Sequence, residues 1–109
     1  MIHDVVILGS TGSIGTSALS SIAKNKKFKI YLLTTKKNAK KVLKQAKKFN
    51  VKKVIITDLN EYNKYKYLFK KNKINFYFGL NNLNKVIKKK SHIQLMAYQE
   101  LMVLNQHWK

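Results

Sequence analysis

Three glycines spaced three residues apart, Gly9, Gly12 and Gly15, are the feature of this sequence that most directly suggests binding chemistry. Glycine lets a backbone turn sharply and approach a ligand closely. Hydroxyl side chains alternate with these glycines, and the first N–H groups of a helix that starts here would have no partner inside the helix. Together these groups predict a phosphate-binding turn. The cofactor-binding residues predicted in this turn are Gly9, Ser10, Thr11, Gly12, Ser13, Ile14 and Gly15.

A buried strand and a helix must hold this turn in place. Residues 5–8 (VVIL) form an unbroken apolar run, which is typical of a strand covered on both faces. Residues 16–23 continue as a helix with apolar side chains on one face. A glycine-rich turn between a strand and a helix matches the first connection of dinucleotide-binding folds. The alternative interpretation is an ordinary tight connection that binds no ligand.

The rest of the chain alternates between strand and helix patterns. Short connections between such elements favour a parallel sheet with right-handed crossovers. The predicted fold is therefore α/β: a Rossmann-like NAD(P)-binding domain with a parallel sheet of about four strands flanked by helices, and incomplete. Asp58 or Asn60 is available to cap the third helix. The further strands are predicted at residues 28–33, 51–57 and 74–78, and the further helices at 39–49, 61–71 and 80–89.

The polar loop after the second predicted strand bears on the choice of cofactor. NAD-binding domains usually place a carboxylate here, where it holds the ribose 2′-hydroxyl. This loop instead contains two threonines followed by Lys36, Lys37 and Asn38. Lysine attracts a 2′-phosphate, whereas a carboxylate would repel it, so the loop favours NADPH over NADH. The alternative is that Lys36 and Lys37 only reflect the high lysine content of the chain.

The formal net charge of +19 has a simpler explanation than nucleic-acid binding. All 23 basic residues are lysine, and proline is absent. Lysine, asparagine, isoleucine, tyrosine and phenylalanine share A/T-rich codons, so an AT-rich genome accounts for the composition. Arginine, the usual reader of guanine, is missing, and we expect no nucleic-acid partner. Two alternatives remain: a stand-alone NADP-binding module, and a basic nucleic-acid-binding protein whose DNA binding would depend steeply on salt.

The composition also argues against several other classes of protein. The chain has no cysteine, which excludes disulfides, thiolate zinc sites and a cysteine nucleophile. No apolar run approaches the ~20 residues that cross a bilayer, and no leader pattern begins the chain, so we expect a cytoplasmic protein without a membrane partner. Because the acidic residues and histidines are scattered, no catalytic or metal-binding residue is predicted. The scattered residues considered are His3, Asp4, Asp58 and Glu61.

Residues 8–19 (LGSTGSIGTSAL) strongly resemble the amino terminus of the 1-deoxy-D-xylulose 5-phosphate reductoisomerase family, NADPH-dependent enzymes of the non-mevalonate isoprenoid pathway. The GSTGSIG heptad is far more specific than the glycine spacing alone, and VIITD at residues 54–58 supports a resemblance that extends to about residue 90. It implies that Thr11, Gly12, Ser13 and Ile14 hold the NADPH phosphates. It also implies that Lys36, Lys37 and Asn38 face the adenosine ribose and its 2′-phosphate. The family often has a glycine where Lys36 stands.

The same resemblance implies a reaction for the parent enzyme. That reaction is the reductive isomerisation of 1-deoxy-D-xylulose 5-phosphate to 2-C-methyl-D-erythritol 4-phosphate, with NADPH and a divalent metal, Mg²⁺ or Mn²⁺. A homodimer is also implied. The metal ligands and substrate site of the family lie beyond the matching region, so no residue of this chain is assigned to them. From this chain alone we expect weak NADPH binding at best, and no turnover.

The composition changes abruptly near residue 92. Residues 1–91 hold 22 lysines, whereas residues 92–109 hold one lysine and the only tryptophan. Back-translated and read in another frame, residues 91–109 give approximately SYTINGISGINGLEPTLE, which resembles the I-x-G-x-x-G-L-x-P-T-L segment of the family. We therefore predict an NADPH-binding domain at residues 1–90 and an out-of-frame tail at 91–109. The family's fifth strand would be lost, and residues 93–104 would form an amphipathic helix or a makeshift strand.

Overall fold

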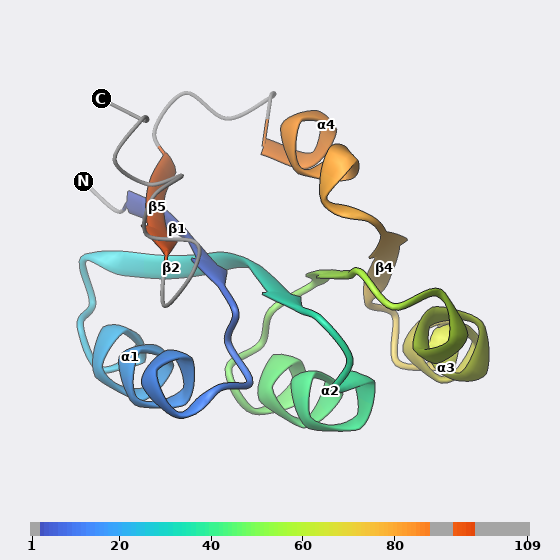
Figure 1. Cartoon of the computed structure of the whole chain (residues 1–109). Coiled ribbons are helices and arrows are strands. Elements are labelled where there is room, and N and C mark those ends of the chain that lie inside the picture. Colours follow the sequence, from blue (N-terminus) through green and yellow to red (C-terminus); the bar gives the residue numbers. More distant parts are fainter. Residues whose placement is uncertain (1–2, 88–92, 98–109) are drawn as a thin grey trace.

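Strands and helices alternate along the chain in the computed structural model, which describes residues 3–87 and 93–97 (Figure 1). The strands are β1 (His3–Leu8), β2 (Phe28–Thr35), β3 (Lys53–Ile56), β4 (Asn75–Phe78) and β5 (Ile93–Ala97). The helices are α1 (Ser13–Ala23), α2 (Ala39–Lys48), α3 (Leu59–Lys71) and α4 (Leu83–Ile87), with a short 3-10 helix η1 (Leu80–Asn82) before α4. No helix in this part of the chain is both long and apolar enough to span a membrane.

The five strands form one parallel sheet in the order β4-β3-β2-β1-β5. Strands β1 to β4 are added one after another on one side of β1, and β5 returns to the other side. This reversal defines a doubly wound sheet, whose ligands bind outside the carboxyl ends of the strands. The predicted α/β, Rossmann-like fold class is therefore confirmed.

Helices cover both faces of the sheet, as Figure 1 shows. Helices α1, α2 and α3 lie on one face, because the three crossovers from β1 to β4 run in the same direction and share a right-handed sense. The connection that contains α4 runs back across the sheet, and α4 lies on the opposite face.

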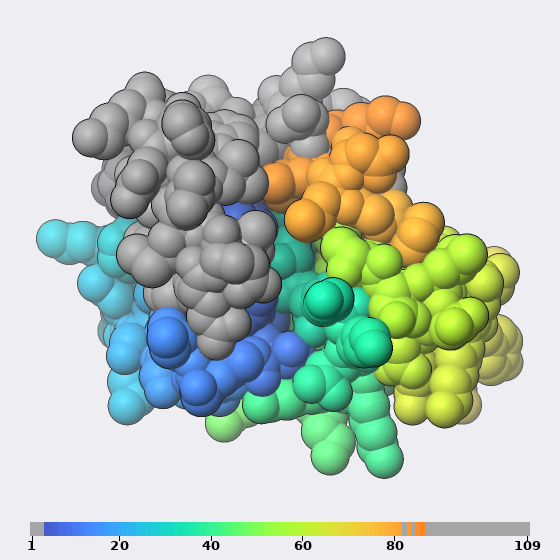
Figure 2. Space-filling view, viewed as in Figure 1, coloured from blue at the N-terminus to red at the C-terminus, as the bar shows by residue number. Residues whose placement is uncertain are grey.

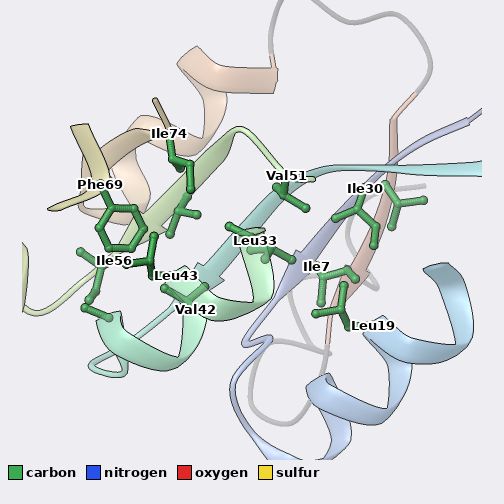
Figure 3. Packing of buried hydrophobic residues seen from close by; sticks show 14 residues of the cluster. Ile7, Leu19, Ile30, Leu33, Val42, Leu43, Val51, Ile56, Phe69 and Ile74 are labelled. Carbon is green, nitrogen blue, oxygen red and sulfur yellow. The ribbon is translucent and has the colours of Figure 1, made fainter. Parts of the chain in front are cut away.

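Two apolar clusters flank the sheet, and β1 contributes to both. Val5 and Ile7 pack under α1, α2 and α3 in the larger cluster, part of which is drawn in Figure 3. Val6 and Leu8 point the other way and pack with residues of α4. All four side chains are fully buried, which explains why the run has no polar alternation. The larger cluster also contains Leu19, Ile30, Leu33, Val42, Leu43, Val51, Ile56, Phe69 and Ile74.

The first and last helices differ from their predicted bounds. Helix α1 begins at Ser13, three residues earlier than predicted, with Gly12 as its N-cap and a 2.8 Å bond from the Thr16 N–H to the Gly12 carbonyl. The single helix predicted at 80–89 is divided into η1 and the short α4, and residues 88–89 lie outside the described part of the chain. Gly79, with φ +90°, ends β4 in a conformation that L-residues rarely adopt.

The sheet has a fifth strand, and of the two alternatives predicted for residues 93–104 the makeshift strand is confirmed over residues 93–97. Strand β5 pairs in parallel with β1, with Asp4 opposite Ile93 and Leu8 opposite Ala97. The physical reason is that strand pairing uses backbone N–H and C=O groups, which every residue except proline supplies in full. The sheet therefore extends past the predicted boundary at residue 90. Residues 98–104 of the predicted element lie outside the described residues.

Asp58, rather than Asn60, caps α3. The Asp58 carboxylate accepts a 2.9 Å hydrogen bond from the Glu61 N–H. We expect Asp58→Ala to lower the free energy of unfolding by about 1 kcal/mol, because one N–H of the first turn loses its partner. Urea denaturation measures this change. The exposed Asn60 serves as the control, and Asn60→Ala should cost less than about 0.5 kcal/mol. Equal losses for the two variants would contradict the assignment.

Candidate cofactor-binding site

Hydrogen bonds connect the glycine turn to Thr34 near the end of β2. Gly9 has φ +75°, a left-handed conformation that suits glycine. Its N–H donates to the Thr34 carbonyl at 3.1 Å and to Thr34 Oγ1 at 3.0 Å. The Ser10 N–H donates to the same carbonyl at 2.9 Å. The position of the turn is therefore fixed relative to the loop that follows β2.

The other two glycines have different structural roles. Gly15 is buried in the first turn of α1, where a Cβ atom would overlap the Gly9 carbonyl oxygen and lie 2.9 Å from Ser10 Cα. Gly15 therefore allows α1 to pack closely against the turn. Gly12 is the N-cap of α1, in an extended conformation (φ −73°, ψ 170°).

A cavity of about 420 Å³ opens at the carboxyl ends of β1, β2 and β3. It brings together the glycine turn and the loop after β2, which are about 25 residues apart in the sequence. The segment after β4, drawn orange in Figure 2, lies against the yellow-green segment that follows β3. Six of the predicted cofactor residues line the cavity. These are Gly9, Thr11, Gly12, Lys36, Lys37 and Asn38, and the lining is completed by Thr34, Thr35, Thr57 and Leu80.

The electrostatics of this cavity suit an anion. Helices α1 and α2 both begin at it, with Gly12 and Asn38 as N-caps, and neither N-cap makes a side-chain capping bond. Neither helix has an acidic residue in its first turn. The Ser13 and Ile14 N–H groups of α1 have no hydrogen-bond partner among the described residues, whereas the Ala39 N–H of α2 donates to the Lys37 carbonyl at 2.8 Å. Both helices still place the positive ends of their dipoles at the cavity. Lys36 and Lys37 are exposed and add two full positive charges, and no carboxylate belongs to the lining.

Four of the predicted residues do not line the cavity: Ser10, Ser13, Ile14 and Gly15. Ser10 is fully buried, and its hydroxyl donates a 2.9 Å hydrogen bond to Gln45 Oε1. The Ser10 side chain therefore stabilises the turn from the protein interior and does not line the cavity. Ser13 and Ile14 are exposed at the start of α1, and 51% of the surface of Ile14 is accessible to solvent.

Lys36 occupies an ordinary backbone conformation. The non-glycine residues with positive φ in the described part of the chain are Asn50 and Lys73, so the conformation at Lys36 does not require glycine. The lysine at a position where the family often has glycine is therefore accommodated without backbone strain, and its side chain is exposed beside the cavity.

Several residues that shape the site were not predicted from the sequence. Thr35 Oγ1 lies 2.7 Å from Thr11 Oγ1, and Lys41 Nζ donates to the Thr11 carbonyl at 2.7 Å. Gln45 is only 8% exposed on the apolar face of α2. A signal for Gln45 was available, because a polar residue among the apolar positions of an amphipathic helix needs a buried hydrogen-bond partner.

In the part of the chain that the structure describes, the acidic residues and histidines do not come together as a metal-ligand set. No group of three or more His, Cys, Asp or Glu side chains occurs within the described residues. His3 and Asp4 begin β1 at the amino end of the sheet, opposite the cavity. The donors described here therefore do not fit a divalent metal centre.

Comparison with known proteins decides the family. A family model described as 1-deoxy-D-xylulose 5-phosphate reductoisomerase matches residues 5–107. The chain belongs to this reductoisomerase family. The reductoisomerase of Pelagibacter ubique (strain HTCC1062) is 46% identical over 90 residues, which are 82% of this chain and 23% of that relative. The reductoisomerase of Thermoanaerobacter sp. (strain X514) is 34% identical over 96 residues, 87% of this chain and 25% of the relative.

Solved reductoisomerases share the fold. The structure of the Zymomonas mobilis reductoisomerase in complex with NADPH matches with a TM-score of 0.69 and 31% identity, covering 79% of this chain and 23% of that one. A reductoisomerase structure in complex with NADPH, fosmidomycin and magnesium matches with a TM-score of 0.74, covering 86% of this chain and 24% of that one. Its 23% identity supports the fold alone. This chain thus spans about a quarter of the length of the reductoisomerases it matches.

Proposed function

We propose that this chain is the NADPH-binding part of a 1-deoxy-D-xylulose 5-phosphate reductoisomerase. The observation that carries the proposal is the cavity at the carboxyl ends of the strands, where two uncapped helix N-termini meet Lys36 and Lys37 without a lining carboxylate. The Zymomonas mobilis relative, which shares this fold, was solved in complex with NADPH. Dinucleotides bind at this edge of doubly wound sheets.

Two groups of residues would each bind a different part of the cofactor. The backbone of Thr11 and Gly12, with the first N–H groups of α1 at Ser13 and Ile14, would hold the phosphates that join the two nucleotides. Lys36, Lys37 and Asn38 would hold the adenosine ribose and its 2′-phosphate. In this assignment Ser10 and Gly15 shape the turn without contacting the cofactor.

For the whole protein we propose the reductive isomerisation of 1-deoxy-D-xylulose 5-phosphate to 2-C-methyl-D-erythritol 4-phosphate. Bound NADPH supplies the hydride for that reduction. The residues described here bind and orient the cofactor, and they contain no donor set for a divalent metal. We therefore assign the metal ligands and the catalytic residues to parts of the full-length family sequence that this chain does not match.

The cofactor assignment predicts a preference for NADPH over NADH. A charge-assisted hydrogen bond contributes about 1.5–3 kcal/mol, so recognition of the 2′-phosphate should favour NADPH by roughly ten- to a hundredfold. Calorimetric titration of the 109-residue chain with each cofactor at the same ionic strength measures the two dissociation constants. Equal affinities, or no saturable binding of NADPH, would overturn the assignment.

We also expect this chain to bind NADPH without turning over substrate. Mixed with 1-deoxy-D-xylulose 5-phosphate, NADPH and Mg²⁺, it should leave the NADPH absorbance at 340 nm unchanged. The full-length Zymomonas mobilis relative serves as the positive control. Substrate-dependent oxidation of NADPH by the chain alone would show that catalytic groups are present in it, contrary to the proposal.

We propose, as a separate matter, that residues 91–109 are read out of frame, after an NADPH-binding domain at residues 1–90. The support is the loss of lysine near residue 92 and the family-like segment in the shifted frame. The pairing of β5 with β1 is compatible with this proposal, because that pairing uses only backbone groups. DNA sequencing through the codons for residues 88–92 should show the family-like segment in another frame. Its absence from all three frames would refute the proposal.

Two further proposals rest on family membership alone. The full-length protein is a homodimer, and it is cytoplasmic. Light scattering on the full-length protein would measure the first, and cell fractionation the second. A monomer at micromolar concentration, or recovery with the membrane or a secreted fraction, would contradict the respective proposal.

A further inference from the structure

Gln45 of α2 forms a reciprocal pair of hydrogen bonds with Ser10 of the glycine turn. The Ser10 hydroxyl donates to Gln45 Oε1, and Gln45 Nε2 donates to the Ser10 carbonyl, both at 2.9 Å. Thr16 Oγ1 of α1 donates to the same carbonyl at 3.2 Å. Ser10 is fully buried and Gln45 nearly so, which shields these bonds from competition with water.

These bonds fix the direction of the next N–H group. In a planar trans peptide the C=O and the N–H point in opposite directions. With the Ser10 carbonyl held toward α1 and α2, the Thr11 N–H must point away from them. That N–H has no hydrogen-bond partner within the described residues, and Thr11 lines the cofactor cavity. The orientation of an unpaired N–H in a cavity-lining residue is thus influenced by a side chain 35 residues away.

Gln45 acts on the cavity only through the turn. It lies in the groove between α1 and α2, together with Thr16 and Leu19, and it does not line the cofactor cavity. Lys41, one turn earlier on the same helix, donates to the Thr11 carbonyl at 2.7 Å. Two successive carbonyls of the turn are therefore held by α2, whose own N-terminus borders the other half of the cavity at Asn38.

We propose that Gln45 is a positioning residue for NADPH, which holds the Ser10–Thr11 peptide so that the Thr11 N–H faces the cofactor phosphates. This inference rests on the proposed cofactor. The role requires both a donor and an acceptor, which the glutamine amide supplies. Leucine would leave the buried Ser10 hydroxyl without its acceptor and the Ser10 carbonyl with Thr16 as its one donor, and glutamate would lack the donor for that carbonyl.

The test compares three variants by NADPH and NADH titration at a temperature well below their melting points. Gln45→Leu and Gln45→Glu should each weaken NADPH about tenfold, as expected for the loss of roughly one well-made hydrogen bond to a phosphate. NADH should weaken by the same factor, because the 2′-phosphate is held by Lys36 and Lys37. Val42→Ala, a buried change on the same helix that does not touch the turn, should lower the melting temperature and leave both affinities within about twofold.

The outcomes separate this inference from the proposed function. Unchanged affinity in the Gln45 variants, or a change in the NADPH-to-NADH ratio, would overturn the positioning role. If the wild-type chain bound no NADPH, the proposed function would fail, and the amide NMR spectrum of the free protein would still decide the role of Gln45. Both Gln45 variants should shift the Thr11 and Gly12 amide resonances, whereas Val42→Ala should not. Spectra in which the two amides are unaffected by Gln45→Glu would refute the proposal without any cofactor.

Discussion

Gly15→Ala should lower the free energy of unfolding by about 3 kcal/mol and abolish NADPH binding. The added Cβ would overlap the Gly9 carbonyl oxygen and meet Ser10 Cα at 2.9 Å. Both neighbours are backbone atoms, and Gly9 is already held by bonds to Thr34 at 3.0 and 3.1 Å. The clash cannot be relieved by a side-chain rotation, so α1 and the turn must separate.

Urea denaturation and NADPH titration measure the two effects of this substitution. Ser17→Ala is the matched control, because Ser17 is exposed on the same helix and no described hydrogen bond uses its hydroxyl. That control should change stability by less than about 0.5 kcal/mol and leave the affinity intact. A Gly15→Ala variant as stable as the Ser17 control would show that α1 does not pack against the turn as described.

The double substitution Lys36→Gln/Lys37→Gln should weaken NADPH roughly thirtyfold and leave NADH within about threefold. The two ammonium groups border the cavity and would face the 2′-phosphate, which NADH lacks. Because both side chains are exposed, their contribution should shrink as salt rises. The measurement is therefore a pair of titrations at low and at physiological ionic strength.

A charge-matched control distinguishes local recognition from the overall field of a chain with net charge +19. Lys26 and Lys27 lie just before β2, at the amino end of the sheet, far from the cavity. Lys26→Gln/Lys27→Gln removes the same charge and should weaken each cofactor by less than threefold. If the two double variants lost NADPH affinity to the same extent, the assignment of Lys36 and Lys37 to the 2′-phosphate would be wrong.

Several features that depend on local sequence were predicted correctly, although the bounds of the first and last helices were not. Residues 5–8 predicted a strand buried on both faces, and the structure places their side chains in two separate clusters. The glycine turn and the loop containing Lys36, Lys37 and Asn38 do meet at one cavity. Thr57 could also have been predicted to line the cavity. The residue after β3 must lie at the same edge of a parallel sheet as the residues after β1 and β2.

Features that depend on contacts between distant segments were not predictable from local patterns. Ser10 has the same spacing and side-chain type as a phosphate ligand, and only its pairing with Gln45 shows that its hydroxyl faces the interior. The cap of α3 could not be assigned between Asp58 and Asn60 without the geometry of that turn. The sequence pattern of residues 93–97 did not decide between a helix and a strand, because it has no clear period, whereas pairing with β1 needs only a backbone edge.

The strand order has a consequence for how the protein is made. From β1 to β4, each strand is laid beside the strand synthesised just before it, and only β5 must return across the sheet. Every residue that lines the cavity occurs by Leu80. Because domains fold as they emerge during synthesis, the binding pocket can begin to assemble before β5 has left the ribosome. A cellular cofactor would then act as a folding ligand, stabilising the nascent four-stranded sheet by mass action.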